Sequence, residues 1–145
     1  GDLDYIHSVE RISKLSNVIS INGGVQLDLM GQENAESTGT RQLSGIGGQM
    51  DFLEGAYRSK GGKGFICINS SRVTKDGERK SNILATIPGG STISAPRTMI
   101  QYVATEYAIA SLSGKTLRER AEAMASIAHP DFREELMKYA RENFK

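Results

Sequence analysis

Three glycines in the stretch SGIGGQMDF, residues 44–52, are the first candidates for chemistry. Gly45, Gly47 and Gly48 precede a run with helical spacing, so they stand at a predicted helix N-terminus. Free backbone amides there attract negative charge, and missing side chains let a ligand approach the main chain. A dinucleotide-binding fingerprint is excluded because Met50 occupies its third glycine position. The alternatives are an anion or oxyanion site and a sharp turn that only needs positive φ, and the residues alone favour the turn.

Two polar residues at predicted strand ends could also take part in chemistry. Asn22 ends an apolar strand and precedes Gly23 and Gly24. Its amide could orient a carboxylate or carbonyl group, or it could simply cap the turn. Glu106 follows the predicted strand 101–105 and is either a carboxylate nucleophile or a structural hydrogen-bond acceptor. The sequence alone does not rank these two roles.

Thiol, imidazole and metal chemistry find little support in the sequence. The single cysteine, Cys67, lies in the apolar run 64–68 and is predicted to be a small buried residue. Neither His7 nor His129 lies near it in sequence, and His129 is interpreted as a helix cap or a fixed core contact. One cysteine and two histidines cannot form a structural zinc set.

Length and charge bound the remaining classes. The 145 residues fit a single domain, predicted here as residues 1–145. Lysine plus arginine number 18 against 17 acidic residues, so the net charge of +1 gives no argument for nucleic acid or an anionic membrane as a partner. The apolar runs are too short to span a bilayer. A reducing, cytoplasmic setting is therefore the default prediction.

A group of basic residues flanks one predicted strand, and some of them could meet a phosphate-bearing ligand. We favour the simpler interpretation that these are solvated loop charges. The group consists of Arg58, Lys60, Lys63, Arg72, Lys75, Arg79 and Lys80.

The elements that must position these residues form an α/β pattern. Apolar spacing predicts helices over residues 2–12, after Gly48, after a capping box at Thr116, and from Pro130. We expect the first two strands to pair as a hairpin, residues 33–43 to form a loop, and residues 71–80 to form a mobile surface loop. Strands are predicted at 17–22, 25–29, 64–69, 81–87, 91–94 and 101–105.

Four segments, taken in order, closely resemble the C-terminal part of the acetyl-CoA hydrolase/transferase family, and especially its 4-hydroxybutyrate and butyrate/acetate-type CoA-transferases. They are ISINGGVQLDLMGQ, SGIGGQMDFLEGAYRSKGGKG, VATEYAIASLSGKTLRERAEAM and IAHPDFREELM. The resemblance covers nearly the whole chain. It implies an α/β domain with a mixed, largely parallel sheet flanked by helices.

The same resemblance implies the chemistry. In the family, coenzyme A moves from an acyl-CoA to a small carboxylic acid through a glutamyl-CoA intermediate; coenzyme A is a substrate, and no metal or redox cofactor is needed. Gly45, Gly47 and Gly48 match the glycine-rich turn whose amides lie near the thioester. Asn22 matches an active-site asparagine, and the basic loop around Lys75 lies where CoA contacts are plausible.

The family's nucleophilic glutamate belongs to a motif upstream of anything found in this chain. By resemblance, Glu106 matches a different position, with a structural or supporting role. We therefore expect a C-terminal part of a CoA-transferase that is inactive alone. The alternatives are a catalytically inactive CoA-binding or subunit-interaction module and an acyl-CoA hydrolase. An apolar sheet edge or surface left uncovered would favour a homodimer.

Overall fold

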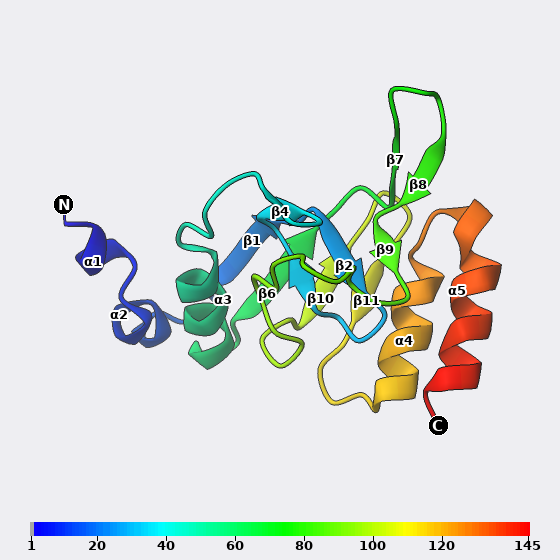
Figure 1. Cartoon of the computed structure of the whole chain (residues 1–145). Coiled ribbons are helices and arrows are strands. Elements are labelled where there is room, and N and C mark those ends of the chain that lie inside the picture. The colour runs from blue at the N-terminus through cyan, green and yellow to red at the C-terminus, as the bar shows by residue number, and fades with distance from the viewer. Residues whose placement is uncertain (1) are drawn as a thin grey trace.

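A largely parallel sheet forms the centre of the computed structural model, which describes residues 2–145 (Figure 1). Its strand order is β1-β6-β10-β11. Strands β1 (Ile19–Gly23), β6 (Lys63–Cys67) and β10 (Tyr102–Ala104) run parallel, and β11 (Ile109–Ser111) pairs antiparallel with β10. The prediction of a mixed, largely parallel sheet in an α/β domain is confirmed.

A second, smaller sheet corrects the predicted hairpin. Strand β2 (Gln26–Asp28) pairs with β3 (Glu33–Asn34) and β9 (Ile83–Leu84), not with β1. All three residues of β2 are buried, so both of its faces lie inside the protein. The turn at Gly23 and Gly24 carries the chain out of the central sheet, where β1 takes β6 as its parallel partner.

Several predicted loops and strands differ from the structure. Residues 33–43 contain β3 and the short pair β4 (Ser37–Thr38) and β5 (Arg41–Gln42). The predicted mobile loop 71–80 is a hairpin of β7 (Ser71–Val73) and β8 (Arg79–Ser81) that projects from the body (Figure 1). The predicted strand 81–87 shortens to β9, and 91–94 forms no strand; Ala95 beside it bridges to Glu33.

Local capping signals predict the later helices well. Thr116 forms the expected capping box with Glu119, and Pro130 opens the last helix, with the His129 side chain accepting from the Asp131 amide as its cap. The predicted helix 2–12 is broken instead at Ser8, whose side chain caps a second helix. The helices are α1 (Leu3–Ile6), α2 (Val9–Lys14), α3 (Gln49–Arg58), α4 (Leu117–Ser126) and α5 (Pro130–Asn143).

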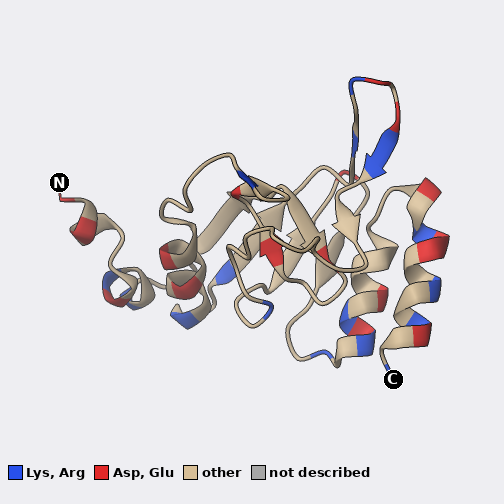
Figure 2. Ribbon diagram, viewed as in Figure 1, with Lys and Arg blue, Asp and Glu red and all other residues tan. Residues whose placement is uncertain are grey.

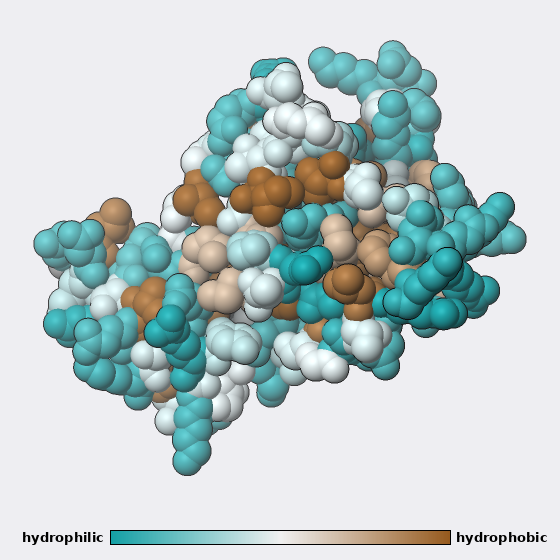
Figure 3. All heavy atoms as spheres, turned by 60° about the horizontal axis from the view of Figure 1, so that its bottom comes forward, coloured by the Kyte–Doolittle hydropathy of each residue, from teal (hydrophilic) through white to brown (hydrophobic). Residues whose placement is uncertain are grey.

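The longer helices pack at opposite ends of the central sheet. Helix α3 packs on β1 and β6, while α4 and α5 lie side by side at the other end, where α4 packs on β11 (Figure 1). Acidic and basic residues are interspersed along α4 and α5 (Figure 2), in keeping with the balanced charge of the sequence. Seen from below, hydrophobic side chains gather near the middle and the α4–α5 end is hydrophilic (Figure 3).

The two faces of the central sheet differ in burial. Side chains alternate between faces along each strand. One face carries Ile66 and Val103, which are fully buried in the core. On the other face, Ile21 is 68% exposed and Ile109 is 62% exposed, and Phe65 aligns in register with Ile21. An apolar sheet face is therefore open in this chain.

Candidate functional site

The glycine turn lies at the carboxyl edge of the parallel strands. A short connection, residues 59–62, joins the end of α3 to the start of β6, so the N-terminus of α3 lies toward the carboxyl end of β6. Ligands of open α/β sheets bind outside the carboxyl ends of the strands. A depression of about 430 Å³ lies at that edge, lined by Gly24, Cys67, Ile68, Asn69, Ala104, Thr105 and Glu106.

The turn itself presents unused backbone amides. Gly48 occupies the position before α3, with no side-chain cap, and Gly47 has a positive φ of 59°. Among residues 2–145, the amides of Gly45 to Gly48 have no hydrogen-bond acceptor. A Cβ added at Gly45 or Gly47 would meet nothing within 4 Å, so the turn is open there. Within the turn, only Gly47 has a positive φ. The turn forms without using the backbone amides of Gly45 to Gly48 in internal hydrogen bonds.

A histidine covers the last residue of the turn. A Cβ on Gly48 would lie 2.5 Å from Cε1 of His7, so the imidazole packs directly on this glycine. His7 Nδ1 also lies 3.3 Å from Oδ2 of Asp51, and its ring meets the edge of Phe52 at 5.4 Å between centroids. The segment before α2 thus closes one side of the turn and leaves Gly45 and Gly47 accessible.

Asn22 is placed on β1, close to the same edge. Its side chain is half-buried on the face that packs against the core, and its Nδ2 donates to Oγ of Ser20 at 2.8 Å. The amide is therefore held in a fixed orientation by its own strand. Gly24, two residues later, lines the depression and donates its backbone N–H to the Cys67 carbonyl at 3.1 Å.

A buried glutamate that the sequence did not single out joins these two segments. Glu33 is 0% exposed, and its Oε2 accepts a hydrogen bond from Nε2 of Gln49, the first residue of α3. Its Oε1 has no partner among the described residues and faces Gly24, where a Cβ would lie 2.8 Å away. Burial raises the pKa of Glu33 to about 7, with the nearby Glu36 charge adding to the rise and the Gln49 bond opposing it.

Glu106 lies in the depression with both carboxylate oxygens engaged. Oε1 accepts from Oγ of Ser70 at 2.5 Å and Oε2 accepts from the Ser70 amide at 2.9 Å. Partial desolvation acts to raise the pKa of Glu106, but the Ser70 hydrogen bonds outweigh it and hold the pKa below its ordinary value. This geometry favours the structural acceptor over the nucleophile.

Cys67 corrects another prediction because its side chain is exposed, not buried. Alternation along β6 buries Ile66 and turns Cys67 to the open face of the sheet. The thiol thus lines the depression at the carboxyl edge.

Lys75 is not brought near the glycine turn. It lies exposed in the turn of the β7–β8 hairpin, which projects from the side of the molecule away from α3 (Figure 1). Other basic residues of the hairpin have local partners: Arg72 donates to Oδ1 of Asn82 at 2.5 Å, and Lys80 pairs with Glu78 at 3.1 Å. These contacts favour the interpretation as surface charges.

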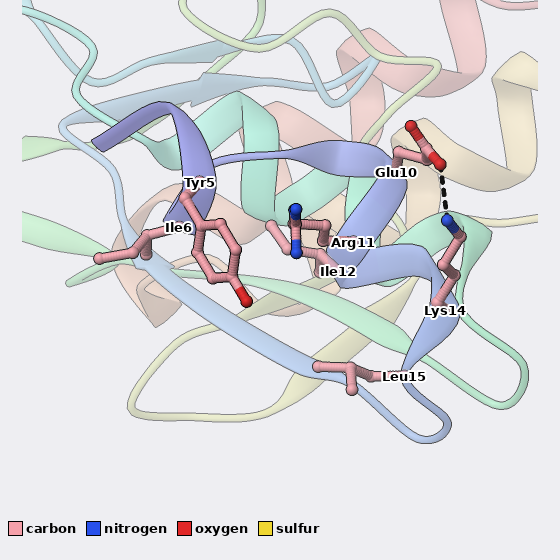
Figure 4. A pocket seen from close by; sticks show the side chains of 7 residues that line it. All are labelled: Tyr5, Ile6, Glu10, Arg11, Ile12, Lys14 and Leu15. Atoms are coloured by element: carbon pink, nitrogen blue, oxygen red, sulfur yellow. Dashed lines mark hydrogen bonds and ion pairs between the residues drawn. The ribbon is translucent and has the colours of Figure 1, made fainter. Parts of the chain in front are cut away.

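A larger depression, about 630 Å³, lies against α1 and α2 (Figure 4). Its polar groups are already paired, since Lys14 binds Glu10 at 2.6 Å and the Arg11 guanidinium lies 3.8 Å from the centroid of the Tyr5 ring. It also lies away from the carboxyl edge of the sheet. The smaller depression at the carboxyl edge of the sheet is therefore the stronger candidate site.

The fold is that of an α/β domain, and its candidate ligand site lies at the carboxyl edge of a largely parallel sheet. The family model for the acetyl-CoA hydrolase/transferase C-terminal domain matches residues 1–140. The chain belongs to this family. None of the helices in residues 2–145 is long and apolar enough to cross a membrane. Within these described residues, no three His, Cys, Asp or Glu side chains are grouped so that they could hold a metal ion.

Individual relatives agree with this assignment. The chain is 46% identical to the butyryl-CoA:acetate CoA-transferase of Anaerostipes caccae, over 95% of this chain and 31% of the relative. It is also 46% identical to the 4-hydroxybutyrate coenzyme A transferase of Clostridium kluyveri, over 98% and 32%. The crystal structure of RipA from Yersinia pestis superposes with a TM-score of 0.83 at 39% identity, over 96% of this chain and 30% of that one. The chain thus spans about a third of the length of these relatives. Two acetyl-CoA hydrolases, from Eremothecium gossypii and Candida albicans, are 31% and 30% identical to it over 24% of their length.

Proposed function

We propose that residues 1–145 form the C-terminal domain of a CoA-transferase, in which the glycine turn presents backbone amides to the thioester carbonyl of an acyl-CoA. The observation that carries this proposal is the set of unpaired amides at Gly45 to Gly48 at the start of α3, where the space beside Gly45 and Gly47 is open. When a nucleophile attacks a thioester, negative charge develops on the carbonyl oxygen. Fixed N–H donors and a helix N-terminus stabilise that charge.

The proposed reaction follows the chemistry of CoA transfer. A glutamate carboxylate from outside this chain attacks the thioester carbon, the C–S bond breaks, and CoA leaves as its thiolate with an acyl-glutamyl anhydride left behind. The thiolate then attacks the glutamyl carbonyl, releasing the first acid and giving the glutamyl-CoA thioester. A second small carboxylic acid takes the CoA by the reverse steps. Coenzyme A is a substrate, and no further cofactor enters.

Other residues have supporting roles in this proposal. Asn22, held by Ser20, would orient the acyl or carboxylate group beside the turn. Lys75, on the projecting hairpin, would reach only the phosphate-bearing end of CoA. The open face of the central sheet, with Ile21 and Ile109 exposed, supports a homodimer formed by a second copy on this face.

A matched pair of glycine variants tests the role of the turn. Gly47 and Gly114 both have positive φ, 59° and 72°, and both have open space at the Cβ position. Alanine should therefore strain each site by a similar amount, about 1 kcal/mol. Only Gly47 lies in the proposed site; Gly114 lies between β11 and α4.

We expect acetyl-CoA, titrated against the ¹⁵N-labelled chain, to shift the amide signals of Gly45 to Gly48. Gly47→Ala should weaken binding at least about fivefold, because the amides lose their common orientation, while Gly114→Ala binds like the unmodified chain. Equal effects of the two variants, or shifts confined to the β7–β8 hairpin, would refute the proposal. A hydrolase is distinguished in the longer protein by release of free acid from acyl-CoA without any acceptor acid.

A further inference from the structure

Two segments that flank the proposed site meet at one buried side chain. Gln49 follows Gly48 directly, so its position fixes the end of the glycine turn. Gly24 follows the last residue of β1 and lines the depression at the sheet edge. Glu33 contacts both, one carboxyl oxygen bonded to Gln49 and the other against Gly24.

The contact between Glu33 and Gly24 leaves no room for a side chain at position 24. Gly24 leaves room for the Glu33 oxygen, because any Cβ there would lie 2.8 Å from it and 3.1 Å from a methyl group of Ile66. Backbone bonds hold Glu33 in place, since its carbonyl accepts from the Ser94 amide at 2.8 Å and its N–H donates to Ala95 at 3.0 Å. Because the side chain is also fully buried, the carboxyl group has no free space into which it could move without displacing its neighbours.

We propose that Glu33 is a positioning residue that sets the spacing between the glycine turn and the end of β1. The inference rests on the proposed function of the turn, but it makes its own prediction. With its proton, Glu33 sits against Gly24 as a neutral group. Without the proton, a buried carboxylate oxygen has no donor, and both contacted segments must shift to admit one.

Other charged groups near Glu33 must be separated from its effect. Glu36 is the charge that acts on it directly, and Asp28 on β2 is engaged by Gln32 through two hydrogen bonds. Asp51 on α3 contacts His7, which covers Gly48. Because histidines can change charge near neutral pH, His7→Gln is the necessary control.

The first test needs no ligand. Backbone amide signals of Gly24 and Gly48 and the side-chain amide of Gln49 are followed by NMR from about pH 5.5 to about pH 8.5. We expect all three to titrate with one common midpoint near neutral pH, to keep doing so in His7→Gln, and to lose this titration in Glu33→Gln. In Gln49→Leu, the amide signal of Gly24 should still shift with pH, but the amide signal of Gly48 should no longer shift with it. Independent midpoints, or a common titration that persists in Glu33→Gln, would overturn the proposal.

The second test uses acetyl-CoA as the probe. Its dissociation constant should rise about fivefold across the same pH range in the unmodified chain and in His7→Gln, and stay constant in Glu33→Gln. If acetyl-CoA fails to bind near the turn while the ligand-free titration appears, the proposed function fails and the positioning role stands. If acetyl-CoA binds with the same pH dependence in Glu33→Gln, the positioning role fails alone.

Discussion

Replacing Glu33 with glutamine should change how the stability of the chain depends on pH. Burial raises the pKa of Glu33 from 4.5 to about 7, so the folded state holds the proton more tightly than the unfolded state. The stabilising contribution of the protonated group is therefore complete below about pH 4.5 and is lost as the pH rises through about 7. At 1.36 kcal/mol per pKa unit the full loss is about 3 kcal/mol.

Glutamine is nearly isosteric with the protonated acid and does not ionise, so it keeps the neutral state at every pH. Unfolding by urea, measured from about pH 5 to about pH 8.5, should show the stability of Glu33→Gln rising relative to the unmodified chain by about 2.5 kcal/mol. Other titrating groups are common to both proteins and cancel in this difference. A difference that stays flat within about 0.5 kcal/mol would refute the assignment of the raised pKa to Glu33.

Three further predictions concern the core, the open sheet face and the chemistry. Arg120 donates to the carbonyls of Met30, Leu112 and Arg97 at 2.7–2.9 Å. Arg120→Met should therefore destabilise the chain by about 3 kcal/mol in urea unfolding. A loss below about 1 kcal/mol would show that these hydrogen bonds do not stabilise the core. Ile21, 68% exposed, should support a dimer that light scattering detects and that Ile21→Lys dissociates; a monomeric unmodified chain at high concentration would argue against it. The chain alone should show no CoA transfer from butyryl-CoA to acetate, and turnover would mean that a nucleophile such as Glu106 lies within it.

Signals carried by neighbouring residues in sequence were sufficient for part of the fold. The capping box at Thr116 and the proline at Pro130 place α4 and α5 correctly, because caps act within one helical turn. The glycines at 45–48 were likewise placed at a helix start. Strand partners were not predictable in the same way, because pairing joins distant residues. Strand β1 takes β6, more than forty residues later, as its neighbour.

The residues missed in the site depend on tertiary burial. Glu33 stands in a polar stretch, and nothing in its neighbours in sequence distinguishes it from a loop glutamate. It becomes a buried carboxyl only in the folded chain, where its side chain bonds to Gln49 of α3 and packs against Gly24. The sequence wrongly predicts that Cys67 is buried for a related reason. An apolar run predicts a strand, but it does not indicate which face of that strand is covered.

We propose that an acyl-CoA binds at the carboxyl edge of the sheet, where Cys67 lines the depression. Because Cys67 is the only cysteine of the chain and is exposed, the rate of its alkylation by iodoacetamide reports directly on that edge. With acetyl-CoA at about ten times its dissociation constant, we predict alkylation about tenfold slower, and little slowing with adenosine 3′,5′-bisphosphate, which lacks the thioester arm. Bound acetyl-CoA that leaves the alkylation rate unchanged would show that the acyl-CoA does not bind at this edge.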